Sequence, residues 1–400
     1  MADPNQLLSP SIISKNTLAI LENNLVAAGK VNRQFENQFN KIGATITVRM
    51  PNRFVVKDGP SLQIQNIVEP STALTISYQK HVDFQFSQSE LLLTIEEFSD
   101  RYLKPAAVKL ANQIDMDVLG VYDSFYNLVG NPGTIPNSFA SLKAVGKRMD
   151  KMAVPQDGRT LILGVDANWE IAEALSSNNY VRSVAEPAFK GYLASIANLE
   201  IYEDQNAPQH TVGAYSGGSP VVSTGAQTGS SLVTSGWPHG VTGLLNVGDV
   251  FTVTGVHSVN PANLQANSDL AEFVVTAVAN SDSSGNATID ISPSIVALDS
   301  GSAYATVDVS PLENAPITVM GAASTTYEQN LGFSRDAIGL VCVPIELPQG
   351  VDFAARQTWK GISLAIVRQF DINSYVMPCR IDTLYGVAPF YPELGVRLSN

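Results

Sequence analysis

Residues 44–60 have the sequence ATITVRMPNRFVVKDGP, which sets the pattern for this part of the chain. Apolar residues alternate with polar ones at Ile46, Val48 and Met50, the period of two expected of a strand with one buried face. The Asp-Gly-Pro triplet at the end of the stretch breaks the strand pattern. Because a second alternating series follows, we predict a long two-stranded β-loop over residues 44–86. A lone hairpin is marginally stable in water, so this loop is expected to lie on a neighbour.

Helices are predicted on both sides of this loop. Residues 10–28 are expected to form an amphipathic helix in an N-terminal arm, because Ser9 can cap it and Gly29 can end it. After the loop, Pro105 opens a long "spine" helix to about Leu128, along which apolar residues recur every seven positions. Shorter helices are expected at residues 138–152, 168–175 and 180–196, with strands at residues 160–165 and 199–203. This mixture indicates an α+β fold.

The composition changes at Gly217, and residues 217–313 are dominated by Gly, Ser, Thr, Ala, Val and Asn. Strand-like runs separated by turn residues indicate a small all-β domain, a barrel or a sandwich. These runs are residues 250–254, 273–278, 287–291 and 303–309. Buried strands are expected after the segment, at residues 338–345, 362–370 and 375–387. Because mixed α and β patterns surround it, we interpret the segment as an insertion.

The net charge of -13 is concentrated in one region. No Lys or Arg lies between Lys190 and Arg335, and this stretch carries 12 acidic residues, which give it a net charge of -12. Nucleic-acid affinity rests on Lys and Arg that displace counterions. The region is therefore excluded as a phosphate-binding surface.

Motifs that carry catalysis or bind cofactors are missing from the sequence. It has no dinucleotide fingerprint, P-loop, G-x-S-x-G elbow, C-x-x-C or H-E-x-x-H. His81 and Asp83 share one strand face, and Asp115 and Asp117 form one of several acidic pairs, but we interpret all of these as solvated surface. We therefore predict no catalytic, cofactor-binding or metal-binding residue and no enzymatic activity.

A basic stripe lies on the helix predicted at residues 138–152. It consists of Lys143, Lys147, Arg148 and Lys151. We interpret it as a solvated helix face, with packaged DNA or an acidic partner as the alternative neighbour.

The sequence also bears on location. No apolar run approaches the roughly 20 residues that span a bilayer. The polar N-terminus lacks the pattern of a signal peptide. The two cysteines, Cys342 and Cys379, are too few for a disulfide framework. We expect both to be buried thiols in a protein made in a reducing cytoplasm.

Three stretches resemble a known family: residues 47–54 (TVRMPNRF), 333–338 (FSRDAI) and 379–387 (CRIDTLYGV). Together with the order of the parts, they resemble the Hong Kong 97-type capsid fold, and within it the P-twenty-two-type coat proteins of short-tailed double-stranded DNA phages. The resemblance implies six parts. These are an N-terminal arm (1–43), an extended β-loop (44–80), a peripheral domain with the spine helix (81–155), the first part of an axial domain (156–216), an inserted β-barrel-like domain (217–313), and the second part of the axial domain with C-terminal strands of the peripheral domain (314–400).

By this resemblance the chain is expected to be a major capsid protein. Such a protein forms pentamers and hexamers in a closed icosahedral shell, encloses double-stranded DNA without sequence-specific binding, and has no cofactor and no membrane association. The resemblance also implies a scaffolding protein, a portal, and a precursor shell that assembles in the host cytoplasm and expands on packaging. The β-loop would overlap a neighbouring subunit, which makes Arg49, Arg53, Lys57 and Asp58 the candidate inter-subunit contacts.

Other classes of protein stay open at this point: an encapsulin-like nanocompartment shell, a secreted or surface β-rich protein, and an enzyme with an unrecognised site. The charge adds one expectation for a shell. Residues 217–313 carry 8 acids and no Lys or Arg. Because packaged DNA would repel this charge, the inserted domain is expected on the outer face.

Overall fold

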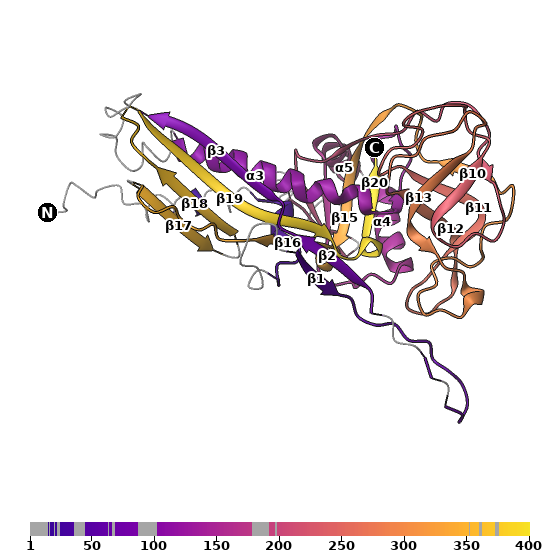
Figure 1. The fold of residues 1–400 in the computed structure, drawn as a ribbon. Helices are drawn as coiled ribbons and strands as arrows, with labels where there is room; N and C mark the ends of the chain where they lie inside the picture. Colours follow the sequence, from indigo (N-terminus) through magenta and orange to yellow (C-terminus); the bar gives the residue numbers. More distant parts are fainter. Residues whose placement is uncertain are drawn as a thin grey trace. The chain divides into compact units, whose positions relative to one another are not determined.

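The computed structural model describes most of the chain (Figure 1). The described residues are 15, 17–19, 21, 25–35, 45–62, 64, 65, 69–86, 102–177, 192–196, 198–351, 353–359, 362–372 and 376–400. The chain falls into two compact units. Unit 1 contains residues 1–48, 71–118 and 338–388, and unit 2 contains residues 49–70, 119–337 and 389–400.

Unit 1 is built on a five-stranded sheet with the strand order β16-β19-β18-β17, in which β3 also pairs with β19. The strands are β3 (Tyr78–Phe86), β16 (Ile338–Cys342), β17 (Phe353–Trp359), β18 (Ile362–Arg368) and β19 (Met377–Pro389). The antiparallel β3–β19 ladder is continuous from Tyr78↔Tyr385 to Phe86↔Met377. The later part of the second alternating series, Tyr78–Phe86, therefore pairs with the C-terminal part of the chain, and the prediction of a β-loop as far as residue 86 is wrong for this part. The earlier part, Ser71–Thr75, does pair within the loop.

The predicted spine helix is α3 (Lys104–Leu119), which runs along β3 and β19 (Figure 1). Its packed face consists of Ala107, Ala111, Ile114 and Val118, all fully buried at helical spacing. The helix is shorter than predicted. A 3-10 segment follows at Gly120–Ser124, and Leu128 lies in strand β4. Buried apolar residues such as Phe125 and Leu128 follow Leu119, but the chain there is no longer α-helical, and β4 pairs with another strand.

The N-terminal segment contacts α3. Described residues 15, 17–19 and 21 are helical, and Leu21 is fully buried. The helix predicted over residues 10–28 ends before Leu25, because Ala27–Gly29 form a 3-10 turn instead. The backbone N–H groups of Val26 and Ala28 each donate to the Asp115 carboxylate at 2.8 Å. These bonds hold the end of the segment against the middle of α3. Residues 10–14, 16, 20 and 22–24 of the prediction lie outside the described residues.

The predicted β-loop forms only a short ladder. Strands β1 (Thr45–Arg49) and β2 (Ser71–Thr75) make a separate two-stranded sheet. The Met50 N–H donates to the Pro70 carbonyl at 2.9 Å where this stem ends. No strand is found among the described residues of 50–70. Strand propensity alone does not produce a ladder there, because a strand needs a partner.

Unit 2 contains a mixed seven-stranded sheet with the order β4-β20-β15-β5-β7-β6, in which β8 also pairs with β15. The strands are β4 (Asn127–Val129), β5 (Arg159–Leu163), β6 (Tyr192–Ile196), β7 (Leu199–Glu203), β8 (Gln209–Thr211), β15 (Thr326–Ser334) and β20 (Gly395–Ser399). Helices α4 (Phe139–Lys151) and α5 (Val165–Ser177) contribute Val145, Met149 and Ile171 to its core. The predictions for these two helices and for β5 and β7 are confirmed.

The helix predicted at residues 180–196 is wrong at its C-terminal end. Residues 192–196 form strand β6, which pairs antiparallel with β7. Pairing with a neighbouring strand overrides local helix propensity here. The rest of that prediction lies outside the described residues.

A second sheet of unit 2 closes into a barrel, with the order β14-β11-β12-β13-β10-β9. Its strands are β9 (Val221–Val222), β10 (Gly229–Ser235), β11 (Val250–Val259), β12 (Ala266–Val275), β13 (Ala287–Ile295) and β14 (Ile317–Val319). A bridge between Val221 and Pro316 joins its two edges. The interior holds Phe251 and Phe273, whose ring centroids are 5.8 Å apart, and the buried Trp237.

One strand predicted in the barrel is wrong. Residues 303–309 form no ladder; Val307 makes only isolated bridges, to Ser258 and Ala297. The side chain of Val307 is still fully buried. The apolar pattern therefore predicted burial correctly but not a strand.

The barrel leaves and rejoins the mixed sheet at neighbouring strands. β8 precedes the barrel and β15 follows it, and Thr211 pairs with Thr326 across this ladder. An insertion between these positions leaves the mixed sheet continuous.

Candidate functional site

The four residues predicted to contact a neighbouring subunit lie in or beside the segment between β1 and β2. Arg49 forms an ion pair with Glu69 at 3.2 Å, and both side chains are largely exposed. Lys57 and Asp58 are also exposed. Arg53 differs, because its side chain is two-thirds covered and pairs with Glu393. The structure therefore does not bring the four together as one cluster.

The same segment exposes large apolar side chains, which the sequence analysis did not single out. Their exposed fractions are 62% for Phe54, 92% for Val56, 88% for Leu62 and 85% for Ile64. We call these four residues the apolar strip. A monomeric protein rarely exposes such a group without a binding partner. The signal was present in the sequence as strand-type residues on both sides of the Asp-Gly-Pro break.

Arg148 of the predicted basic stripe is buried against the barrel. It is 4% exposed and donates from Nη2 to Glu272 Oε2 at 2.8 Å and from Nε to Asn127 Oδ1 at 3.0 Å. Glu272 lies on β12 of the barrel. The interpretation of Arg148 as solvated surface is wrong, because its acidic partner is the inserted domain of the same chain.

The rest of the stripe is graded in exposure. Lys151 Nζ lies 2.5 Å from Asp269 Oδ2, also on β12, and its side chain is one-fifth exposed. Lys143 and Lys147 are exposed, as expected of a solvated helix face. The end of α4 therefore forms an electrostatic contact with the barrel, while its beginning does not.

The protonation of Glu272 is set mainly by burial, which raises the pKa of its carboxyl to about 7. Two contacts oppose this rise: the charge of Arg148, and the Leu128 N–H, which donates to Glu272 Oε2 at 2.8 Å. The carboxyl oxygens can accept these bonds in both protonation states. The contact thus persists while its charge changes near neutral pH.

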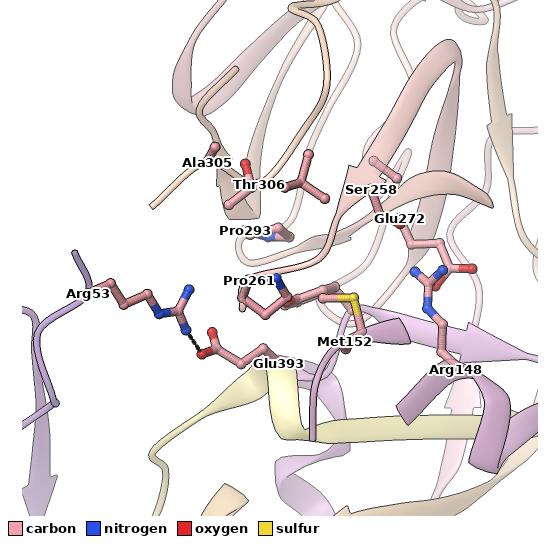
Figure 2. Close-up of a pocket in the computed structure, with 13 residues that line it drawn as sticks. Arg53, Arg148, Met152, Ser258, Pro261, Glu272, Pro293, Ala305, Thr306 and Glu393 are labelled. Atoms are coloured by element: carbon pink, nitrogen blue, oxygen red, sulfur yellow. Dashed lines mark hydrogen bonds and ion pairs between the residues drawn. The ribbon is translucent and has the colours of Figure 1, made fainter. Parts of the chain in front are cut away.

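A cavity of about 50 Å³ lies between this pair and a second arginine–glutamate pair (Figure 2). Arg53 points toward Glu393 on one side, and Arg148 toward Glu272 on the other. Binding sites for small molecules have volumes of roughly 300 Å³ or more. The cavity is therefore part of a contact between segments and not a ligand pocket.

Asp249 organises a second polar contact of the barrel. It is fully buried, and Oδ2 accepts hydrogen bonds from the N–H of Gly213 at 3.0 Å and of Asn246 at 2.7 Å. Its Oδ1 lies 2.7 Å from His210 Nε2 on β8. His210 is therefore a link between the mixed sheet and the barrel.

Arg397 of β20 completes this contact. It is almost fully buried and donates from Nη2 to the Gly248 carbonyl at 2.8 Å. Its guanidinium carbon lies 5.7 Å from the ring centroid of Tyr122. Burial lowers the pKa of Arg397 to about 10. Removing this side chain would leave the Gly248 carbonyl without that partner.

The two pairs named in the sequence analysis, His81/Asp83 and Asp115/Asp117, have different surroundings. His81 Nδ1 lies 2.9 Å from Asp83 Oδ2 on the exposed face of β3, as predicted for a surface pair. Asp115 is buried, and Asp117 accepts a hydrogen bond from the Tyr385 hydroxyl at 2.5 Å. The interpretation of this acidic pair as solvated surface is wrong, because the two carboxylates fasten other segments to α3.

Within the part of the chain that the structure describes, no three His, Cys, Asp or Glu residues gather in a way that could hold a metal ion. In the same part, none of the helices combines the length and the apolar character that crossing a bilayer requires.

Comparison with known proteins identifies the class. The family described as "P22 coat protein - gene protein 5" matches residues 1–228 and 205–399, nearly the whole chain. The fold is that of a phage capsid protein of the Hong Kong 97 type, with an all-β barrel inserted in its α+β body. The chain belongs to the P22 coat protein family, whose members are structural proteins.

Individual relatives are distant. The major capsid protein of Acyrthosiphon pisum secondary endosymbiont phage 1 is 26% identical over 159 residues, which span 38% of this chain and 37% of that protein. A solved structure from Mycobacterium phage Che8 is 13% identical, covers 94% of this chain and 90% of its own, and has a TM-score of 0.47. The capsid of Ralstonia phage GP4 is 8% identical, with 92% and 86% covered and a TM-score of 0.45.

Proposed function

We propose that this chain is the major capsid protein of a tailed double-stranded DNA phage, the repeating subunit of a closed icosahedral shell. Family membership supports the class of protein. The observation that carries self-assembly is the apolar strip, four large side chains exposed on one segment. In this proposal the strip is buried against a second copy of the chain.

Burial of the strip favours association. Covering one such side chain contributes about 1.5–3 kcal/mol, before the cost of bringing subunits together. In a shell every subunit repeats this contact, so a weak pairwise contact is sufficient. Arg49, Lys57 and Asp58 lie close to the strip in sequence and are exposed, which suits the polar rim of such an interface.

We extend the proposal to finer properties that the resemblance to the family implies. They include pentamers and hexamers, a scaffolding protein and a portal, a precursor shell that expands on packaging, and assembly in the host cytoplasm. The six-part domain division, with an inserted domain at residues 217–313, belongs to the same proposal. The virion is the location, and neither a cofactor nor an enzymatic activity is part of the function.

The test compares shell formation by the purified wild-type chain with that of the double variant Val56→Ser, Ile64→Ser, using electron microscopy. We expect closed shells from the wild type and folded, unassembled subunits from the variant. Leu312→Ser is the matched control, since Leu312 is 74% exposed on a barrel loop, and it should still assemble. Shells from the double variant, or none from the wild type with scaffolding protein supplied, would contradict the proposal.

The same particles test which way the barrel faces. Four acids of the barrel, Asp282, Asp290, Asp299 and Glu313, are exposed, while Asp269 and Glu272 are paired within the chain. An exposed acidic surface suits the outer face, away from packaged DNA. Antibodies against residues 217–313 should decorate intact, DNA-filled particles. Labelling of broken particles alone would place the barrel inside, and particles free of DNA would favour a nanocompartment shell.

A further inference from the structure

Arg53 makes three contacts with parts of the chain that are distant in sequence. Its guanidinium forms an ion pair with the Glu393 carboxylate. The guanidinium carbon also lies 5.7 Å from the ring centroid of Tyr304. In addition, the backbone N–H of Arg53 donates to the Tyr304 hydroxyl at 3.1 Å. One residue therefore joins the loop segment to the barrel and to the C-terminal turn at once.

Both partners of Arg53 are held in place by their own surroundings. The Tyr304 N–H donates to Ser302 Oγ at 3.1 Å, and the adjacent Ala305 is buried. Glu393 lies in the 3-10 turn Pro392–Leu394. The Leu394 N–H closes this turn by donating to the backbone carbonyl of Tyr391 at 3.0 Å. The fold therefore fixes the backbone positions from which Tyr304 and Glu393 reach Arg53.

The other polar contacts of the loop are internal. Arg49 pairs with Glu69, and Val55 N–H donates to the side-chain oxygen of Gln65 at 2.9 Å. Among the described residues of 50–65, Arg53 is the one whose hydrogen bonds and ion pairs reach another part of unit 2. The internal contacts give the loop a shape, but they do not fix its direction.

We infer that Arg53, Tyr304 and Glu393 form a latch that fixes the direction of the loop relative to the barrel. Arg suits this role because a planar guanidinium can stack on a ring and pair with a carboxylate at the same time, which an ammonium group does less well. In this arrangement the inserted barrel sets where the apolar strip points before any second copy arrives.

The latch also lies beside the contact between the barrel and helix α4. The cavity in Figure 2 is lined by Arg53 and Glu393 and by the Arg148–Glu272 pair. Opening the latch removes one wall of the cavity and lets water reach that buried pair. The position of the loop and the attachment of the barrel are therefore coupled within unit 2. The consequence for assembly rests on the proposed function, whereas the latch itself is a property of the free subunit.

The test measures the loop direction in the free, full-length subunit. Spin labels are placed on Ile64→Cys in the loop and Val278→Cys on the barrel, two exposed positions, and their distance distribution is recorded by pulsed electron resonance. The native Cys342 and Cys379 are buried, as predicted from the sequence, and burial raises the pKa of Cys379 to about 12, so neither should take the label. A narrow distribution is expected for the otherwise wild-type chain.

Two single-atom changes, Tyr304→Phe and Glu393→Gln, should broaden the distribution, and Arg53→Ala should broaden it most. The bond to Glu393 is charge-assisted, and loss of such a bond shifts a two-state equilibrium by about tenfold, whereas the bond to the Tyr304 hydroxyl is neutral and its loss has a smaller effect. We therefore expect the width to rise by about twofold or more in Glu393→Gln and by less in Tyr304→Phe. Arg49→Ala, which removes an exposed pair inside the loop, is the control and should leave the width unchanged.

The distance distributions decide whether the latch exists without reference to shells. Circular dichroism and the two single-atom variants guard against misfolding of Arg53→Ala. A broad wild-type distribution, or equally narrow distributions in all latch variants, overturns the latch. If the latch variants broaden the distribution but still assemble normally, the latch stands and its role in assembly is wrong.

Discussion

The inserted barrel and the extended loop have similar strand-type sequences, but their contacts differ. The barrel joins its own edges through Val221 and Pro316 and buries Phe251 and Phe273 inside. The loop has a stem of two five-residue strands, and beyond it the apolar strip faces solvent. The same residue types therefore form a self-sufficient core when strands have partners on both sides. Without such partners they form a surface that is available for association.

The largest effect expected from this difference is on stability. Phe251→Ala should lower the free energy of unfolding of the barrel by about 3–5 kcal/mol, because it leaves a cavity in a closed core. Val56→Ala in the loop should change it by less than about 0.5 kcal/mol in the free subunit. Urea unfolding followed by tryptophan fluorescence, to which the buried Trp237 of the barrel contributes, measures both. Similar losses for the two variants would mean that Val56 is packed in the free subunit.

A smaller effect should come from the attachment of the barrel. Glu272→Gln keeps an oxygen for the Leu128 N–H and removes the titration. Because burial raises the pKa of Glu272 from 4.5 to about 7, the protonated form stabilises the fold. That contribution is complete below pH 4.5 and is lost as the pH rises through 7. The stability of the wild type relative to the variant should therefore fall by up to about 3 kcal/mol over this range.

Urea unfolding at a series of pH values checks this prediction. The variant supplies the baseline for all other titrating groups, so only the difference between the two proteins is interpreted. A difference that does not change between acid and neutral pH would show that Glu272 keeps an ordinary pKa.

The smallest effect is expected for an exposed ion pair of the loop. Arg49→Ala removes an ion pair with Glu69 that is open to solvent. Such pairs contribute about 0–1 kcal/mol, and urea unfolding of the free subunit should register less than about 0.5 kcal/mol. A strong loss of shell formation in the same variant would identify Arg49 as a contact between subunits. A large loss of stability would show instead that the loop depends on this pair.

The sequence was sufficient to predict elements that are defined by local residue spacing, or whose pairing partners are close in sequence. In the barrel, β11, β12 and β13 pair with their neighbours in sequence order. The amphipathic face of α4 likewise follows from local spacing. The end of α3 was predicted wrongly because Leu128 fits the apolar spacing of a helix and is equally suited to a buried strand. Only the pairing of β4 with β20 shows that Leu128 belongs to a strand.

The polar contacts could not be predicted in the same way. Arg148 and Glu272 are 124 positions apart, and Arg53 and Glu393 are 340 apart. A sequence shows which face of a helix is basic, but it does not show what covers that face. Arg53 was recognised as a contact residue, yet its partners in this structure belong to the same chain. Whether it also contacts a second subunit stays a prediction.

The attachment of the barrel has a consequence for protein engineering. Thr211 and Thr326 are direct cross-strand partners, so residues 212–325 leave and rejoin the mixed sheet at one ladder position. A hairpin turn of about two residues is enough to connect such a pair. The mixed sheet can thus accept a different module at this point without a change in its strand order. Any module exchanged there must still provide an acid for Arg148 and an acceptor for Arg397, because both side chains are buried by the barrel that it would replace.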